Sequence, residues 1–336
     1  MAEPHKDLTG AAPERSDGTV AANVVVVGSV NLDLVVSVPH LPAPGETILG
    51  DDLVYRAGGK GGNQAVGAHR LGANTTLIAM TGDDPLGSDL RAALAREGLD
   101  LTHVGEVAGT ATGVAMIVVA DGGENSIVVA PGANRLLQPS TVSGLDVALR
   151  AADALVLQGE VPAPASHEAA SLARTSGATV VLNSAPLPAL PDPDLEKLLG
   201  ATDVLVVNEG EAAQLLGIEP PTTPEEWAAL APRLSELGPA SAVVTLGAAG
   251  AVASESGTAY VQAAFAVDVV DTTGAGDSFT AALAVALAGG RPMADALRRA
   301  CAAGALATTR LGAQAALPTL DELDTFLATG GGEHDA

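Results

Sequence analysis

The chain has 336 residues, which is enough for one large α/β domain or for two domains. Its 40 acidic and 16 basic residues give a net charge of −24, which disfavours nucleic acids and anionic membranes as partners. Hydrophobic residues make up 47% of the chain but aromatic residues only 2%, so we expect an aliphatic core and no platform for stacking nucleobases.

A single cysteine, Cys301, rules out an intrachain disulfide and fits a reducing, cytoplasmic environment. No apolar run approaches the length of a membrane-spanning helix. Segment 1–22 is polar and lacks the apolar core of a signal peptide. We predict that this segment and the tail 329–336 are disordered.

The first strand is predicted from Asn23 to Val30, where a continuous valine run ends at glycine. Such a run is typical of a parallel strand that is buried on both faces. Asn31 and Asp33 follow at its carboxyl end, where open α/β sheets bind ligands, and they could hold sugar hydroxyls. The alternative is a turn built on Asn and Asp, which the local sequence alone favours.

Two pairs of short strands are predicted outside the main α/β pattern. One pair lies at 34–38 and 47–55, and the other lies at 113–120 and 125–130, around the hairpin signal Asp121-Gly122-Gly123-Glu124. No long helix separates the strands of either pair. We therefore expect segments of about 34–56 and 113–130 to form one small sheet that closes over a site as a lid.

A glycine-rich loop, Gly58-Gly59-Lys60-Gly61-Gly62-Asn63, opens a helix predicted over 63–71. Its glycines permit close approach of the backbone to a ligand, and Lys60 and Asn63 supply a charge and an amide. A simple turn remains the alternative, since a lone glycine-rich loop is weak evidence. A strand at 77–80 and a helix marked by Leu86, Leu90 and Leu94 come next.

From residue 153 onward, strands and helices alternate regularly. We predict strands at 154–158, 179–183, 204–208 and 242–246, and helices near 164–176, 209–216 and 225–237. Polar residues stand at the ends of these strands: Glu160, Asn183, Asn208 and Thr245. Four such residues in register predict one shared crevice along the carboxyl edge of the sheet.

Asn208 and Glu211 are close together at a predicted strand–helix junction. They could orient a hydrated Mg²⁺ ion, or they could form a capping pattern at the helix start, and the local sequence leaves both open. Thr245, Gly247 and Gly250 form a strand end and a glycine turn that could flank a nucleotide.

The stretch Asp271-Thr272-Thr273-Gly274-Ala275-Gly276-Asp277-Ser278-Phe279 joins a predicted strand ending at Val270 to a helix over 279–287. The helix N-terminus carries unpaired N–H groups and a partial positive charge, which suit a phosphate. Asp277 then takes a proton during phosphoryl transfer, or it is only a helix N-cap. Helices at 293–309 and 320–328 complete the chain.

No linker rich in Pro, Gly or Ser divides the chain, so residues 23–328 are predicted to form a single domain. We expect an α/β fold in which a doubly wound, mostly parallel sheet has helices on both faces and carries the small β-sheet lid.

The chain resembles the ribokinase-like (PfkB) family of carbohydrate kinases over about Val24 to Leu327. Gly58 to Gly82 resembles the N-terminal signature of the family, and Asp271 to Phe279 resembles its C-terminal signature. The resemblance implies a ribokinase-like fold and ATP-dependent, in-line phosphorylation of D-ribose at its 5-hydroxyl. It also implies a homodimer that pairs through the lid strands. A kinase for another sugar or a nucleoside, or a non-catalytic sugar-binding protein, are the alternatives.

The resemblance also implies roles for individual residues. Asp277 would be the general base, and the amides of Gly274, Ala275 and Gly276 would form the anion hole. The sugar would be bound by Asn31, Asp33, Gly59, Lys60, Asn63 and Glu160. The ATP site would be lined by Asn208, Thr245, Gly247, Gly250 and Gly276. Cys301 would lie near the adenine, or its thiol is a buried packing group, which is the alternative that we favour.

Two metal ions are implied as well. Glu211 would help to position Mg²⁺, through water. An activating K⁺ ion would be held by Asp271, Thr273, Ala307, Arg310, Gly312 and Ala316, mostly through backbone carbonyls. Ala316 departs from the family pattern, in which we expect Ser.

Overall fold

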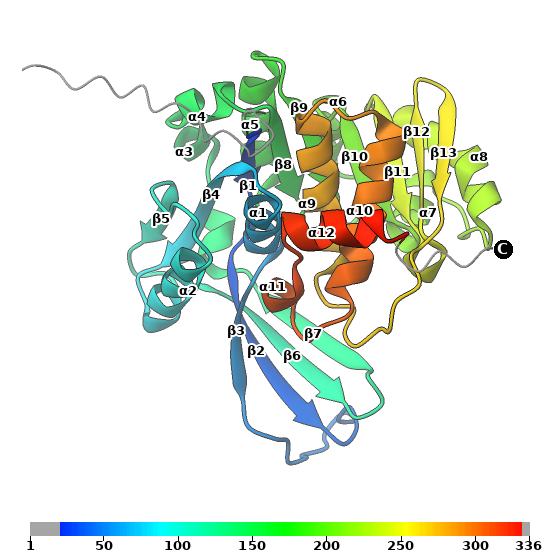
Figure 1. Cartoon of the computed structure of the whole chain (residues 1–336). Coiled ribbons are helices and arrows are strands. Elements are labelled where there is room, and N and C mark those ends of the chain that lie inside the picture. Colours follow the sequence, from blue (N-terminus) through cyan, green and yellow to red (C-terminus); the bar gives the residue numbers. More distant parts are fainter. Residues whose placement is uncertain (1–20, 331–336) are drawn as a thin grey trace, which may run out of the picture.

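A computed structural model of the chain describes residues 21–330 (Figure 1). They form a nine-stranded sheet with helices on both faces and a separate four-stranded sheet, which projects below the body in the view of Figure 1. The predicted α/β architecture with a large, mostly parallel sheet and a second, small sheet is confirmed.

The large sheet is mostly parallel. From one edge to the other, its strands are β13 (Thr258–Gln262), β12 (Ala251–Glu255), β11 (Ser241–Thr245), β10 (Val204–Asn208), β9 (Thr179–Asn183), β8 (Ala154–Gln158), β1 (Asn23–Val27), β4 (Asn74–Gly82) and β5 (Val104–Val107). The pairings from β11 to β5 are parallel, and β12 and β13 add an antiparallel edge.

The valine run of β1 explains why this strand lies at the centre. Val24 and Val26 pack into the core on one face of the sheet, and Val25 and Val27 pack into the core on the other. All four are at most 2% exposed. Because side chains alternate along a strand, only a continuous apolar run can fill both cores, as predicted.

Helices cover each face of the sheet. The core on one face includes α1 (Lys60–Arg70), α2 (Pro85–Arg96), α9 (Ala275–Ala288), α10 (Met293–Ala307) and α12 (Leu320–Ala328). The core on the other includes α3 (Pro139–Ser143), α4 (Asp146–Arg150), α5 (Ala163–Arg174), α6 (Pro193–Gly200), α7 (Glu209–Leu216) and α8 (Pro224–Ser235). Three short helices join elements: η1 (Gly132–Leu136), η2 (Gly247–Ala249) and α11 (Ala313–Ala316).

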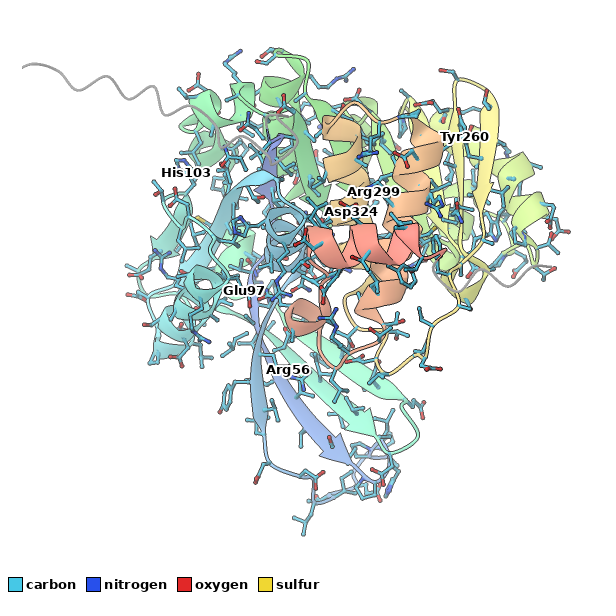
Figure 2. The ribbon with its side chains drawn as sticks, in the orientation of Figure 1. Arg56, Glu97, His103, Tyr260, Arg299 and Asp324 are labelled. Atoms are coloured by element: carbon cyan, nitrogen blue, oxygen red, sulfur yellow. The ribbon has the colours of Figure 1, made fainter. Side chains whose placement is uncertain are left out.

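Local sequence signals account for several helix ends. Capping boxes start α7, α8 and α12, each with an Asn or Thr cap and a Glu three residues later. The last helix is also held in place by an ion pair, since Arg299 of α10 contacts Asp324 of α12 at 2.7 Å (Figure 2). None of the helices within residues 21–330 is long and apolar enough to cross a membrane.

The small sheet joins two segments that are far apart in the sequence. Its strand order is β3 (Val54–Gly58), β2 (Asn31–Val38), β6 (Gly113–Ala120) and β7 (Asn125–Ala130). β2 and β6 pair in parallel along their whole length, while the two outer pairings are antiparallel. The two predicted strand pairs therefore combine into one sheet.

Three predictions for the elements beside the site need correction. Asn31 and Asp33 do not form a turn, because they are the first residues of β2, where Asp33 lies opposite Arg56 of β3. The strand predicted at 47–55 starts only at Val54. The run ending at Val270 is no strand, since Val269 and Val270 are 62% and 56% exposed and the Val270 N–H donates to the Thr308 carbonyl of a loop.

Nine further elements were not predicted from the sequence: β5, β12, β13, α3, α4, α6, α11, η1 and η2. Their segments lack a clear period; β13, for example, alternates exposed with half-buried positions at the sheet edge. At the N-terminus, Ala21 and Ala22 are buried, and the Ala22 carbonyl accepts a hydrogen bond from Asn74 at 2.9 Å. Residues 1–20 and 331–336, which hold most of the segments predicted to be disordered, lie outside the described residues.

Candidate active site

Asp277 lies buried in the first turn of α9, at the point where the two sequence motifs meet. The N-cap of this helix is Gly274, which has φ 80° and no side-chain cap. Asp277 stands three residues further on and is 6% exposed. The N-cap alternative for Asp277 is therefore wrong, and its carboxylate makes its hydrogen bonds to another helix.

That other helix is α1, which supplies two amide donors. Asn63 Nδ2 donates to Asp277 Oδ2 at 2.8 Å, and Gln64 Nε2 donates to Asp277 Oδ1 at 2.9 Å. The helices can approach this closely because Gly67 has no side chain: a Cβ there would lie 2.9 Å from Cβ of Ala281. Each oxygen of the carboxylate thus has one donor, and a carboxylate can accept more.

Sequence reasoning found Asn63 but missed Gln64. Neighbouring residues on a helix point in different directions. A motif that directs Asn63 toward a ligand therefore gives no reason to expect Gln64 at the same site. Here both side chains reach Asp277, since α9 lies across the first turns of α1. Only the packing of the two helices reveals this.

Two strand ends extend the hydrogen-bonded group. Gln158, the last residue of β8, donates through Nε2 to Gln64 Oε1 at 2.7 Å. Asn183, the last residue of β9, accepts from Gln64 Nε2 at 3.3 Å. Of the four polar strand ends predicted to share a crevice, Asn183 belongs to this group, and Gln158, which also belongs to it, was not among the predicted residues.

The loop before α9 presents its N–H groups less freely than the sequence suggested. Of the predicted donors, the Ala275 N–H donates to the Thr272 carbonyl at 3.2 Å and so closes a turn. A Cβ on Gly274 would lie 2.9 Å from Cα of Ala313, whereas a Cβ on Gly276 would meet no atom within 4 Å. The space beside Gly276 is therefore open to a ligand, and Gly274 is packed.

The residues predicted to bind the sugar gather beside Asp277. Gly59 has φ 82° and caps α1, and a Cβ there would lie 2.6 Å from the Asn31 nitrogen. Lys60 is the first residue of α1, and its N–H donates to Glu160 Oε2 at 3.1 Å. The same carboxylate oxygen accepts from the hydroxyl of Ser29.

Asn134 is a further residue that the sequence did not point to. Its Nδ2 donates to Asn31 Oδ1 at 2.8 Å, and its Oδ1 accepts from the Val30 N–H at 3.0 Å. These bonds fix the start of β2, so that Asn31 and Asp33 enter the small sheet in a single orientation. The partner comes from η1, about a hundred residues away, which is why no local pattern reveals it.

The electrostatics of this region are dominated by carboxylates around one lysine. Asp277 raises the pKa of Lys60 against the effect of burial, with smaller contributions in the same direction from Glu160 and Glu211. Burial raises the pKa of Asp33 to about 7, with further upward effects from Glu160 and Asp277 and a downward effect from Arg56. Lys60 is therefore held cationic, and Asp33 titrates near neutrality.

Asn208 and Glu211 form a capping box at the start of α7. The Asn208 N–H donates to Glu211 Oε2, and the Glu211 N–H donates to Asn208 Oδ1, each at 2.9 Å. Burial raises the pKa of Glu211, opposed by the Asn208 N–H and by Lys60. The capping alternative is thus realised, and the second oxygen of Glu211 stays available for another contact.

The other predicted ATP-site residues are spread over the neighbouring elements. Thr245 ends β11 directly opposite Asn208, and its hydroxyl donates to the Val207 carbonyl at 3.3 Å. Gly247 and Gly250 have φ values of 54° and 100°, which only glycine adopts readily. Cys301 lies in the apolar core of α10, where burial raises the pKa of its thiol to about 12, so this side chain is a packing residue.

Asp271 ties together the two loops of the predicted cation site. Its Oδ1 accepts from the Thr273 N–H at 2.9 Å, and its Oδ2 accepts from the Gly312 N–H at 2.8 Å. Burial alone would raise the pKa of Asp271, but hydrogen bonds from Thr273 and Gly312, together with the charge of Arg56, lower it. Its carboxylate is therefore held ionised.

The remaining predicted cation ligands lie around these loops. Ala307 and Ala316 are both fully buried, and Ala316 offers no side-chain oxygen. The Arg310 side chain turns to the surface, where it pairs with Glu322 at 2.9 Å. Arg56, at the end of the small sheet nearest the helices (Figure 2), lies beside Gly312 and Asp271, and sequence reasoning did not point to it.

No group of three or more His, Cys, Asp or Glu side chains in residues 21–330 is arranged to hold a metal ion. A family model described as "pfkB family carbohydrate kinase" matches residues 21–320. The chain belongs to this family of carbohydrate kinases. Both motif segments that converge on Asp277 fall within the match.

Individual relatives match the pfkB-family chain over nearly its full length. Ribokinase of Haemophilus influenzae is 39% identical over 305 residues, 90% of this chain and 98% of that protein. Ribokinase of Schizosaccharomyces pombe is 36% identical over 311 residues, 90% of this chain and 96% of that protein. The structure of Arabidopsis thaliana ribokinase complexed with ribose and ATP matches with a TM-score of 0.83 and 33% identity, over 92% of this chain and 99% of that chain. The predicted ribokinase-like fold is confirmed.

Proposed function

We propose that this pfkB-family protein transfers the γ-phosphoryl group of ATP to the 5-hydroxyl of D-ribose. The observation that carries the proposal is the buried Asp277 carboxylate, which Asn63 and Gln64 hold at the N-terminus of α9. The ribokinase relatives, including the Arabidopsis thaliana protein complexed with ribose and ATP, support the choice of substrates.

The sugar is proposed to lie between the small sheet and α1. Its hydroxyls would be bound by Asn31, Asp33, Gly59, Lys60, Asn63 and Glu160. These residues combine amide donors, carboxylate acceptors and one cation, which is the mixture that orients a polyhydroxylated ring. Their common position beside Asp277 supports the assignment, because the attacking oxygen must reach the base.

Asp277 would act as the general base. It accepts the hydroxyl proton as the sugar oxygen attacks the γ-phosphorus in line, and no covalent enzyme intermediate is required. Negative charge that develops on the transferred group would be met by the amides of Gly274, Ala275 and Gly276 and by the N-terminal dipole of α9. The Ala275 N–H would exchange its long bond to Thr272 for the phosphoryl oxygen.

ATP is proposed to lie along the ends of β10 and β11, beside Asn208, Thr245, Gly247 and Gly250. A Mg²⁺ ion would neutralise charge on its phosphates, and Glu211 would hold the ion through water. The free oxygen of Glu211 and its proximity to Lys60 support this arrangement. Cys301 is left out of the proposed adenine contact because its thiol is packed in the core.

A K⁺ ion is proposed to lie behind Asp271. The carboxylate there is ionised and fixed between two loops, and the carbonyls of Thr273, Ala307, Arg310 and Gly312 would complete an oxygen donor set. Ala316 would contribute only its backbone. We therefore expect K⁺ stimulation of turnover, with weaker binding than a side-chain oxygen at position 316 would give.

We further propose that the protein is a cytoplasmic homodimer that pairs through the small sheet. Tyr55, Met116 and Val128 lie in register on one face of this sheet and are 45% to 59% exposed. Such a row of exposed apolar side chains is typical of a covered surface. A mass measurement in solution at micromolar concentration tests this, and a monomer would contradict it.

A coupled ADP-release assay tests the proposed function. Ribose, deoxyribose, fructose and adenosine would be compared as acceptors, each with and without K⁺. We expect ribose to give the highest kcat/KM and K⁺ to raise the rate. Turnover with another acceptor but not with ribose would make the protein a kinase of another sugar or a nucleoside, and no turnover with any acceptor would favour a sugar-binding protein.

The affinity for ribose is expected to depend on pH near neutrality. Because the pKa of Asp33 is raised to about 7, this carboxylate becomes protonated below that pH and loses its full capacity to accept hydrogen bonds from hydroxyls. Ribose binding, measured by calorimetry between about pH 5.5 and about pH 8.5, should weaken by up to about tenfold per unit below pH 7. The Asp33→Asn variant should bind more weakly and without this dependence. Equal wild-type affinity across the range would contradict the prediction.

A further inference from the structure

Gln64 contacts the carboxylate that we propose as the general base, yet it was not assigned a role above. It is fully buried in α1, and its Nε2 lies 2.9 Å from Asp277 Oδ1. We propose that Gln64 is a positioning residue for phosphoryl transfer, which holds the carboxylate of Asp277 in the orientation that takes the hydroxyl proton. This inference rests on the function proposed above.

A chain of buried amides holds Gln64 in turn. Gln158 Nε2 donates to Gln64 Oε1 at 2.7 Å, and Gln64 Nε2 lies 3.3 Å from Asn183 Oδ1. Asn183 Nδ2 donates to the Val206 carbonyl at 3.4 Å. Gln158 and Asn183 stand at the ends of β8 and β9, so the chain connects Asp277 to two neighbouring strands in the interior of the large sheet.

The direction of every amide in this chain follows from one negative charge. An ionised carboxylate can only accept hydrogen bonds, so Gln64 must turn its Nε2 toward Asp277. Its Oε1 then faces Gln158, which must present its own Nε2, and Asn183 must present its oxygen. A neutral Asp277 would not impose this order. The arrangement is therefore matched to the ionised base.

Two donors, one on each oxygen, fix the orientation of the Asp277 carboxylate, which a single donor cannot do. With Asn63 alone, the carboxylate of Asp277 could rotate about its Cβ–Cγ bond while keeping that single hydrogen bond. With Gln64 on the second oxygen, the plane of the carboxylate is fixed, and the unused lone pairs point in set directions. Since Asn63 and Gln64 are adjacent on α1, both donors are carried by one rigid element.

Stability alone does not account for the chain. Within residues 21–330, Gln158 Oε1 is buried and has no hydrogen-bond partner. A buried, unpaired acceptor is unfavourable, and an apolar side chain of similar size would avoid it. Gln158 nevertheless donates a short hydrogen bond to Gln64, which is expected if the chain of amides serves to orient Asp277.

The first test is the steady-state kinetics of the Gln64→Met variant, which separates kcat from KM for ribose. Methionine matches glutamine in size but donates no hydrogen bond. We expect kcat to fall by about 10–100-fold and KM for ribose to stay within about threefold, because the base loses its orientation while the proposed sugar contacts remain.

Two further variants separate positioning from folding. Gln158 does not contact Asp277, and we expect Gln158→Met to lower kcat by a smaller factor, again with little change in KM for ribose. Ser166→Ala removes a buried hydroxyl of α5 that has no partner among the described residues, and its kcat and KM should equal those of the wild type. Thermal unfolding of each variant identifies any loss that comes from instability, and Gln158→Met decides if Gln64→Met does not fold.

This inference alone would be overturned if the wild-type protein is active and the Gln64→Met and Gln158→Met variants both keep its kcat. A fall in kcat that only parallels the loss of folded protein would overturn it as well. A wild-type protein without kinase turnover would instead overturn the proposed function, and this inference with it.

Discussion

The Asp277→Asn variant is expected to lose turnover by about 10²–10⁴-fold, the usual contribution of a positioned general base. Asparagine keeps the size of the side chain but cannot take the hydroxyl proton. Its amide nitrogen would also face a donor, either Asn63 or Gln64, so a modest loss of stability is expected too. The measurement is single-turnover kinetics of phosphoryl transfer, with ribose affinity followed separately by calorimetry.

A matched control for this variant is Asp324→Asn. Like Asp277, Asp324 is a carboxylate on a helix. Unlike Asp277, it lies on the surface of α12, where it pairs with Arg299 (Figure 2). Exposed ion pairs contribute little, so wild-type turnover is expected. Near-normal turnover of Asp277→Asn, with ribose bound, would mean that Asp277 is not the base.

Two glycine substitutions in the loop before α9 should have different effects. In Gly274→Ala, a Cβ meets Cα of Ala313 at 2.9 Å, at a φ of 80° that L-residues disfavour. We expect a loss of about 1–3 kcal/mol of stability and a fall of about 10²-fold in kcat, because the N–H donors at the helix start are displaced.

In Gly276→Ala, the added Cβ meets no protein atom within 4 Å. Stability should be unchanged or slightly higher, since alanine favours a helix more than glycine does. If a phosphate approaches here, kcat/KM for ATP should still fall by at least about tenfold. Thermal unfolding and steady-state kinetics measure both effects, and an unaltered kcat/KM would place the phosphate elsewhere.

The sequence allowed much of the large sheet to be predicted. The strands at 154–158, 179–183 and 204–208 and the helix at 209–216 have the expected bounds, because each is marked by its own apolar run or caps. Apolar runs and caps could not decide between the alternative local structures of single residues. Asn31 and Asp33 were compatible with a turn, and only the pairing of β2 with β3 and β6 shows that they begin a strand.

The same limit applies to the candidate site. Asn63 and Asp277 could be singled out because each lies in a glycine-rich loop at the start of a helix. Gln64, Asn134 and Arg56 could not, since each acquires its importance from an element far away in the sequence. Conversely, the resemblance placed Cys301 near the adenine, whereas the fold directs its side chain into the apolar core.

By itself, then, the sequence determined the class of fold, the central strands and the two motif loops, since these depend on residues that are neighbours along the chain. Only the tertiary structure showed that Asp277 is not the N-cap of α9 and which side chains contact its carboxylate. Local sequence allowed a helix cap as readily as a base. The approach of α1 to α9 across Gly67 brings two amides onto its carboxylate, and that contact joins residues more than two hundred positions apart.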